Sequence, residues 1–353
     1  MKYFLFTILL FTCQLVAAQT AIEKVQIYRA QHEGEMMKEY FSLLSIPNYA
    51  LDKINIDKNA LFIETMLKKR GIKTKLLESN TKGSPKAIYG EVIVPGALQT
   101  IIFYAHYDGQ PVSPEKWHPK LEPYQPVLLD KSIEQSGKII AFPASGQPFN
   151  PEWRISCRSS SDDKAGVMTI INAYDALVKT GVKLKNNIKF FFEGEEEIGS
   201  LHLAEILDKH KELLKADLWL IGDGPVHQSG LPMIDFGVRG DVNVDLTVYG
   251  PKRPLHSGHY GNWAPNPCLS MSKLLASMKD EDGMVKIKGY YDDVIPFSDS
   301  EKNAFKAIPS VDLQMRKELG INKPDGGGKS LFETFEWPSL NINGIKCADV
   351  GDN

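Results

Sequence analysis

The sequence predicts an α/β fold, in which a mixed, mostly parallel sheet is flanked by helices and a smaller α+β domain follows. Apolar, strand-like runs alternate with amphipathic helical runs along most of the chain, which is typical of α/β proteins. Several of these runs end in histidine or acidic residues, and ligand sites of parallel sheets lie at the carboxyl ends of strands. An alternating apolar and polar run at 241–249 then predicts a strand of a second domain.

Length and charge narrow the class of protein. The chain has 353 residues, which is more typical of two domains than of one. Lysine and arginine number 41 against 44 acidic residues, for a formal net charge of -3, so the basic footprint of a nucleic-acid-binding protein is missing. We place the domain boundary near Val238 and expect domains at 19–237 and 238–353.

Residues 1–18 have the pattern of a signal peptide. Lys2 supplies a short positive region, an apolar stretch follows, and the small residues Ala17 and Ala18 suit a cleavage site. The apolar stretch is too short for a comfortable membrane span. We therefore expect export to the periplasm or the extracellular space.

The cysteines predict neither a disulfide framework nor a cysteine zinc site. Once residues 1–18 are removed, Cys157, Cys268 and Cys347 remain, an odd number at wide spacings. Any zinc should then be bound by histidine and carboxylate ligands.

The expected elements follow from periodicity and from the residues that interrupt it. A helix begins after the signal peptide and stops before Pro47, and Asp57 can cap a second helix that Gly71 ends. A long polar segment at 113–155 lacks a clear period and is expected to be a functional loop. The remaining elements are strands at 73–77, 87–94, 100–104, 190–192, 218–221, 241–249 and 339–345, and helices at 167–178, 200–215, 268–278 and 299–307.

The most informative stretch is Phe190–Ser200, an apolar strand that stops at a cluster of glutamates. Buried carboxylates are costly unless they bind a metal or a partner, which favours a metal or acid/base site. The alternative is that Glu193–Glu197 open a solvated helix, where acidic residues favour the N-terminal dipole. His202 lies next to the glutamates in sequence but can equally well be a surface residue, and His210 is expected to be a packing or partly buried residue rather than a ligand.

Two more strands end in groups that can bind metal. The strand at 100–104 leads to His106 and Asp108, and in such a pair the histidine can bind a metal while the aspartate accepts its other ring N–H. The strand at 218–221 leads to Asp223. The alternative is that these are unrelated loop residues. Because three strands end in such groups, we nevertheless expect these side chains to meet at one edge of the sheet.

Asp162 and Asp163 follow a run of serines and precede a helix. Serine and aspartate are common N-cap residues, so a purely structural role is the alternative to metal binding.

Four blocks together resemble the M20 family of zinc peptidases, the group of carnosine dipeptidase and glutamate carboxypeptidase type enzymes. The blocks are YAHYDGQPV, SSSDDKAG, FFEGEEEIGS and LHSGHYGNWAPNP. The resemblance implies a zinc-exopeptidase-like catalytic domain and a ferredoxin-like lid domain that forms homodimers. It also implies two Zn²⁺ per subunit, or Co²⁺ or Mn²⁺, and a small peptide as substrate.

The resemblance also assigns roles to single residues. Asp108 would orient His106, Glu196 would be the general acid/base, and His256 of the second domain would reach the substrate carbonyl. The peptide bond to Asp163 is often cis in the family. The implied metal ligands are His106 and Asp223 on one zinc, Glu197 on the other, and Asp162 between the two.

The chain departs from the family pattern in two places. Cys157, Arg158 and Ser159 stand where the family usually has Gly-Arg-Gly. The family's last zinc histidine comes from a C-terminal segment, and the sequence stops at Asn353, so we expect an incomplete lid and an incomplete second zinc site. Besides a peptidase, the alternatives are an N-acyl amino acid deacylase and a non-catalytic peptide- or metal-binding remnant.

Overall fold

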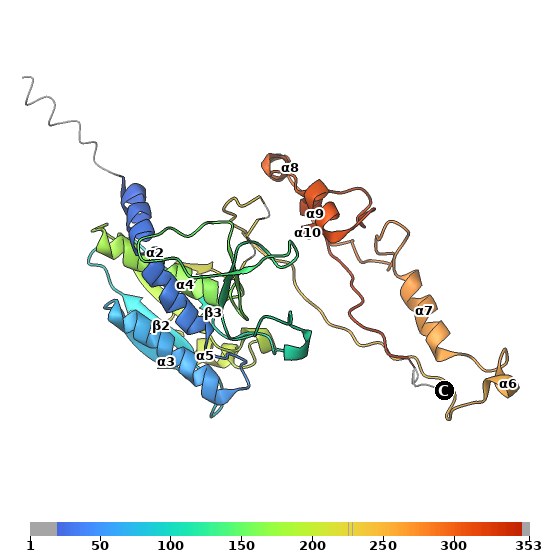
Figure 1. The fold of residues 1–353 in the computed structure, drawn as a ribbon. Helices are drawn as coiled ribbons and strands as arrows, with labels where there is room; N and C mark the ends of the chain where they lie inside the picture. The colour runs from blue at the N-terminus through green and yellow to red at the C-terminus, as the bar shows by residue number, and fades with distance from the viewer. Residues whose placement is uncertain (1–19, 225, 228, 348–353) are drawn as a thin grey trace, which may run out of the picture. The chain divides into compact units, whose positions relative to one another are not determined.

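The computed structural model describes residues 20–224, 226–227 and 229–347. The chain forms two compact units, Met1–Gly224 and Pro225–Asn353, drawn in Figure 1. Their division lies before the boundary that the sequence suggested near Val238. The predicted signal peptide at 1–18 lies outside the described residues.

The first unit is built on a five-stranded sheet with the order β1-β2-β7-β3-β8. The central strand β3 is parallel to both β7 and β8, while β2 is antiparallel to β1 and β7. This arrangement confirms the predicted mixed sheet, and it brings the carboxyl ends of β3, β7 and β8 to one edge. The strands are β1 Lys73–Leu77, β2 Ala87–Val92, β3 Thr100–His106, β7 Asn187–Glu193 and β8 Leu218–Ile221.

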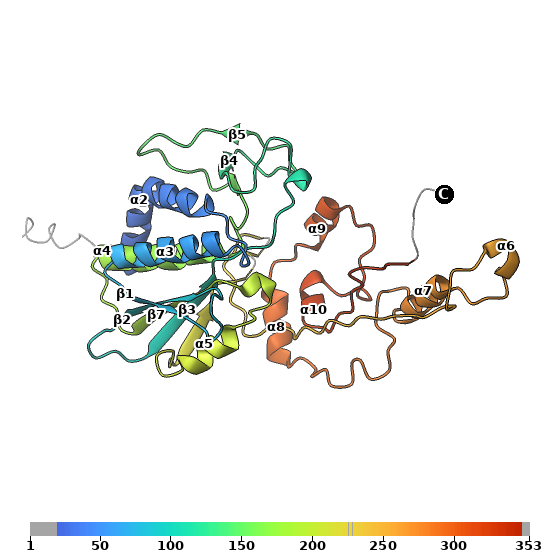
Figure 2. The same cartoon turned by 90° about the horizontal axis from the view of Figure 1, so that it is seen from below.

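Helices cover both faces of this sheet (Figure 2). On one face lie α2 (Ala21–Leu44), α3 (Lys53–Lys69) and α4 (Lys164–Lys179), and on the other lies α5 (Leu203–Lys209). Side chains of β7 point alternately to the two layers: Phe190 and Phe192 join the core under α2–α4, and Phe191 joins the core under α5. A strand covered on both faces is apolar at every position, which explains the unbroken aromatic run.

The structure corrects the predicted boundaries of two helices. Helix α3 begins five residues before the expected start, because the Asp52 side chain accepts a hydrogen bond from the Asn55 backbone N–H at 3.2 Å and caps it. Asp57, the predicted cap, lies inside the helix. The helix expected at 200–215 is shorter than predicted: α5 covers only Leu203–Lys209.

The segment expected as a long loop contains a small sheet of its own. Strands β4 (Val127–Leu129), β5 (Ile139–Ile140) and β6 (Arg154–Ser156) pair antiparallel in the order β5-β4-β6. A short 3₁₀ helix, η1 (Pro114–Lys116), precedes them. Strands of two or three residues carry too little periodicity to be recognised in the sequence.

The named secondary-structure elements of the second unit are all helices in the described residues. The strands predicted at 241–249 and 339–345 are not formed in the described part of the chain, and Val242 and Val244 are 84% and 70% exposed. A half-buried strand needs pairing and a covered face, and these segments have neither. The helices are α6 Ser257–Tyr260, α7 Pro267–Ser277, α8 Asp299–Ala307, α9 Asp312–Leu319 and α10 Leu331–Phe335.

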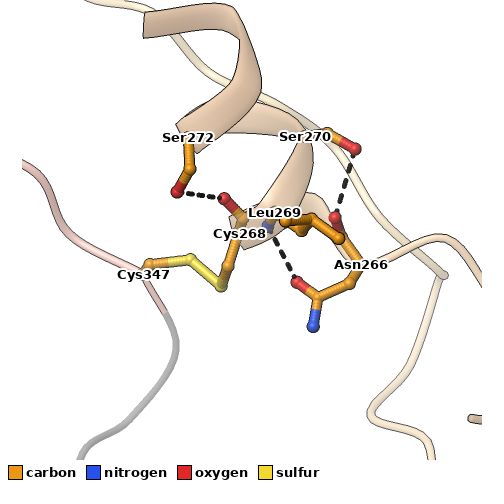
Figure 3. Close-up of a disulfide and its surroundings, with 6 residues drawn as sticks. All are labelled: Asn266, Cys268, Leu269, Ser270, Ser272 and Cys347. Carbon is orange, nitrogen blue, oxygen red and sulfur yellow. Dashed lines mark hydrogen bonds between the residues drawn. A yellow bond between two sulfur atoms is a disulfide. The ribbon is translucent and has the colours of Figure 1, made fainter. Parts of the chain in front are cut away.

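A disulfide joins Cys268 at the start of α7 to Cys347 (Figure 3). The number and spacing of the cysteines, which predicted no disulfide framework, therefore did not reveal this pair. The two residues are 79 positions apart in sequence but 5.7 Å apart between Cα atoms, a proximity that only the folded chain reveals. Cys157 remains as a buried free thiol.

Loss of this disulfide should destabilise the second unit. Closing a loop of this length is worth about 4 kcal/mol in the free energy of unfolding. We expect a Cys268→Ser, Cys347→Ser double variant to lose about that amount in denaturant titration followed by tryptophan fluorescence. The reduced wild-type protein should behave like the double variant. An unchanged unfolding midpoint in both would contradict the assignment.

No helix in the described ranges combines the length and apolar character needed to cross a membrane.

Candidate metal centre

The candidate site lies at the sheet edge where β3, β7 and β8 end. His106 is the last residue of β3, and Asp223 is the second residue after the end of β8. Glu196 and Glu197 lie in a short 3₁₀ turn, η2 (Glu196–Ile198), after β7. Asp162 lies just before α4. Parallel strands therefore deliver side chains from distant parts of the sequence to one place, as the sequence predicted.

His106 is fully buried and stands among carboxylates. Its Nε2 atom is 2.8 Å from Oδ1 of Asp162, 3.7 Å from Oδ2 of Asp223 and 3.8 Å from Oε2 of Glu196. Burial lowers the pKa of His106, but the neighbouring carboxylates of Asp108 and Asp223 outweigh burial and raise the pKa to about 10. The carboxylates around the His106 ring therefore favour a positive charge.

Two sets of side chains have the composition of a metal site. The first is His106, Asp162 and Glu197, and the second is His106, Asp163 and Asp223; within each set the ligand atoms lie within 4.8 Å of one another. Imidazole nitrogen and carboxylate oxygen are common ligands of Zn²⁺. All four residues predicted as ligands belong to these sets, and Asp163 is the addition.

Asp163 is held by the backbone through both carboxylate oxygens. Oδ1 accepts the N–H of Gly166 and so caps α4, while Oδ2 accepts the N–H of His106; both distances are 3.1 Å. Burial raises the pKa of Asp163 to about 7. The bond between Asp162 and Asp163 is cis, as the resemblance implied. The capping alternative thus describes Asp163, whereas Asp162 is exposed and turns toward His106.

Asp108 connects the end of β3 to the turn after β7. Its Oδ1 and Oδ2 atoms accept the backbone N–H groups of Glu196 and Glu197, each at 3.0 Å. Oδ1 also lies 3.3 Å from Nδ1 of His106, a nitrogen that has no hydrogen-bond partner among the described residues. Asp108 can therefore both fix the imidazole and hold the two glutamates in place.

The glutamate cluster separates into two buried and two site-facing residues. Glu193 accepts the Tyr104 hydroxyl at 2.7 Å, and Glu195 accepts both the backbone N–H and Nδ1 of His202, at 2.7 and 2.9 Å. Both are almost completely buried, which excludes a role as surface charges but fits scaffold residues. His202 is therefore the partner of Glu195 rather than a free surface residue.

Glu196 and Glu197 are partly exposed at the site. Burial raises the pKa of the Glu196 carboxyl, against the lowering effect of His106. The Glu197 carboxylate accepts Nε2 of Gln110 at 2.5 Å. Glu196 belongs to neither ligand set although it is close to both. This is the position expected of a proton carrier that works next to a metal without binding it.

Two supporting residues had no clear signal in the sequence. Asn48 is buried and its Nδ2 donates to the Tyr107 carbonyl at 2.8 Å and to Ser159 Oγ at 2.9 Å. Lys164 is also buried and donates to the carbonyls of Leu43 and Ile46, at 2.9 and 2.8 Å. Burial lowers the pKa of Lys164 to about 7. Lys164 thereby ties the start of α4 to the end of α2.

His256 belongs to the second unit. There it caps the short helix α6 by accepting the N–H of Gly258 at its Nδ1 atom, at 3.0 Å, and its ring lies 4.7 Å from that of His259. Its predicted contact with the substrate carbonyl stays a prediction.

Comparisons with known proteins agree with the composition of this site. A family model described as peptidase family M20/M25/M40 matches residues 102–314. A Cys-Gly metallodipeptidase of Candida albicans is 27% identical over 320 residues, which cover 88% of this chain and 60% of the relative. The human Beta-Ala-His dipeptidase is 31% identical over 270 residues, which cover 75% of this chain and 48% of the relative.

A solved structure extends the comparison to the fold. The crystal structure of an M20 family metallo-carboxypeptidase from Sulfolobus solfataricus superposes with a TM-score of 0.68 at 27% identity, covering 90% of this chain and 67% of that chain. The chain spans 60% and 48% of the length of the two curated relatives above. The family model covers more than half of the sequence, and the chain belongs to peptidase family M20/M25/M40.

Proposed function

We propose that the protein is a zinc-dependent peptidase that hydrolyses the amide bond of dipeptides. The observation that carries the proposal is the buried His106 imidazole with Asp162, Glu196 and Asp223 within 4 Å of its Nε2 atom. Support for the substrate class comes from the two curated relatives, whose names describe a Cys-Gly dipeptidase and a Beta-Ala-His dipeptidase.

The donor set fits one zinc ion and supplies part of a second site. His106 and Asp223 would hold one ion, Glu197 would hold the other, and Asp162 would be shared between them, so the second ion finds two of its ligands among the described residues. The carboxylates of Asp108 and Asp223, which raise the pKa of His106, make the surroundings of the ring negative and so suit a metal cation. When bound, such a pair lowers the pKa of a water molecule and polarises the scissile carbonyl.

The protein's own groups supply the proton transfers and their positioning. Glu196 takes a proton from the attacking water and returns it to the leaving amine, a role for which its raised pKa is suited. Asp108 keeps Glu196 in place through the backbone N–H at 3.0 Å and keeps the His106 ring oriented through Nδ1. His256, if it reaches the substrate carbonyl, would stabilise the developing negative charge.

Hydrolysis assays on the zinc-loaded chain test this function. Cys-Gly, β-Ala-His and a neutral dipeptide would be incubated with the protein, with an N-acetyl amino acid as the matched deacylase substrate. We expect release of free amino acids from at least one dipeptide, its loss with a chelator, and its return with zinc. Release of acetate alone would favour a deacylase, and no turnover of any dipeptide would contradict the proposal.

We further propose that the protein is exported and forms homodimers through its second unit. The signal-like pattern at 1–18 supports export, and the Cys268–Cys347 disulfide is stable in oxidising compartments. The resemblance to the family supports dimerisation. N-terminal sequencing of the mature protein and light scattering test the two parts; an intact Met1 and a monomer at all concentrations would contradict them.

A further inference from the structure

Two glutamates stand side by side at the metal centre, and their backbones are held alike. The backbone N–H groups of Glu196 and Glu197 both donate to the carboxylate of Asp108, each at 3.0 Å. Both glutamates are partly exposed, and their side chains are chemically identical. The backbone contacts therefore leave open which glutamate binds a metal ion and which stays free to move a proton.

The side chain of Gln110 distinguishes the two glutamates. Its Nε2 atom donates to Oε2 of the Glu197 carboxylate at 2.5 Å and to the Glu197 backbone carbonyl at 3.3 Å. A hydrogen bond to a carboxylate is charge-assisted and therefore stronger than one between neutral groups. No comparable donor reaches the Glu196 carboxylate in the described part of the chain, where it lies 3.8 Å from Nε2 of His106.

These two contacts also set the orientation of the Gln110 amide. A backbone carbonyl and a carboxylate oxygen are both acceptors, so the nitrogen of the amide must face Glu197 rather than its oxygen. An ionised carboxylate has about four lone-pair sites. The amide occupies one of them and leaves the others of Glu197 to a metal ion.

The loop that carries Gln110 has a fixed backbone. The Gly109 N–H donates to the Asn48 carbonyl at 3.0 Å, and the ring of Pro111 restricts the backbone on the other side. Gly109 is buried, and a Cβ atom there would collide with the Ser159 hydroxyl, which explains the glycine. A fixed backbone lowers the entropy that is lost when the exposed Gln110 side chain is ordered.

Metal ligands depend on contacts of this kind. A carboxylate that binds a metal is itself held by hydrogen bonds from neighbouring groups, and loss of such a contact typically weakens metal binding about 10- to 100-fold. Glu197 forms a ligand set with His106 and Asp162, whereas Glu196 belongs to neither set. Gln110 therefore contacts the member of the pair that is placed as a ligand.

We propose that Gln110 is a positioning residue that holds Glu197 as the metal ligand and leaves Glu196 free for proton transfer. The inference deepens the proposed function and rests on it for the identity of the metal, whereas the hydrogen bond does not depend on catalysis. Gln110 acts through Glu197, and its own amide oxygen is not a ligand.

The first test measures zinc affinity by competition with a chromogenic chelator. Gln110→Met keeps the length of the side chain and removes the donor. We expect it to weaken, about 10- to 100-fold, the binding of the zinc that is lost in Glu197→Gln. The unfolding midpoint should stay unchanged, because Gln110 is exposed. Gln147→Met, at another exposed glutamine of the first unit, is the matched control and should bind zinc as the wild type does.

Double variants show whether Gln110 acts through Glu197. Added to Glu197→Gln, the Gln110→Met change should cause no further loss of zinc affinity, because the carboxylate that the amide holds is already absent. Added to Glu196→Gln, it should keep its full effect. A general loss of structure would instead give additive losses in both backgrounds. Additive losses in both, or coupling to Glu196 in place of Glu197, would overturn the proposal.

A dipeptide assay on the same proteins separates this proposal from the proposed function. Coupling of Gln110 to Glu197 in zinc affinity, without hydrolysis of any dipeptide, would support the positioning role while contradicting the peptidase. Loss of zinc in Glu197→Gln but not in Gln110→Met would overturn the positioning role alone. Unchanged zinc binding in both variants would overturn it together with the assignment of Glu197 as a ligand.

Discussion

Replacing Glu196 with glutamine should lower kcat for dipeptide hydrolysis by about 10²- to 10⁴-fold while zinc content stays at the wild-type level. The amide keeps the size of the carboxylate but cannot take the proton of the attacking water. Glu196 belongs to neither ligand set of the metal centre, so zinc binding should persist. Steady-state kinetics and metal analysis on the same preparation check both parts.

The neighbouring residue supplies the contrast for this prediction. Glu197→Gln makes the same chemical change one position farther along, at a predicted ligand, and should lower zinc content as well as kcat. Glu152→Gln, at an exposed position, serves as the neutral control. If Glu196→Gln loses zinc and Glu197→Gln does not, the two roles must be exchanged.

Replacing His106 with alanine should abolish hydrolysis and weaken zinc binding by at least about 100-fold. His106 is the only residue common to both ligand sets among the described residues. Its loss also leaves Asp162, Glu196 and Asp223 close together without the imidazole between them, so that like charges repel. Equilibrium dialysis with zinc and a dipeptide assay measure the two effects.

His210→Ala is the matched control, because His210 is the partly exposed C-cap residue of α5 and belongs to neither ligand set. It should keep zinc affinity and activity. Circular dichroism shows whether His106→Ala still folds. A folded His106→Ala protein that binds zinc as tightly as the wild type would contradict the assignment of the site.

The candidate metal centre could be predicted from the sequence because its residues interrupt local rules. An apolar strand such as β7 normally ends in a turn, and here it runs into acidic residues whose burial requires compensation. The same reasoning applied to His106 and Asp223, and parallel pairing of β3 with β7 and β8 then brings the three ends together. The fold class followed from the same strands.

The contacts that separate the roles of these residues could not be predicted from the sequence. Asp162 and Asp163 are adjacent and chemically identical, yet only Asp163 has both oxygens bound by backbone N–H groups. Glu195 is one of several adjacent glutamates in the sequence, and its partner His202 becomes evident only when the turn after β7 is folded. Such roles depend on tertiary contacts rather than on spacing.

In the second unit, a clear sequence pattern predicted a strand that the structure does not form. The alternation at 241–249 predicts a strand, but periodicity describes only how a segment would bury one face if a partner were present. Val242 and Val244 lack such cover in the described structure. Cys268 and Cys347, in turn, gave no signal in sequence because pairing of distant cysteines depends on the fold.

The location of zinc in a crystal of the wild-type protein tests the central claim most directly. Anomalous diffraction at the zinc absorption edge should show a peak about 2.0–2.1 Å from Nε2 of His106, with oxygens of Asp162 and Asp223 as its other protein ligands. A zinc ion bound only elsewhere, for example at the exposed pair His256 and His259, with none at His106, would contradict the account.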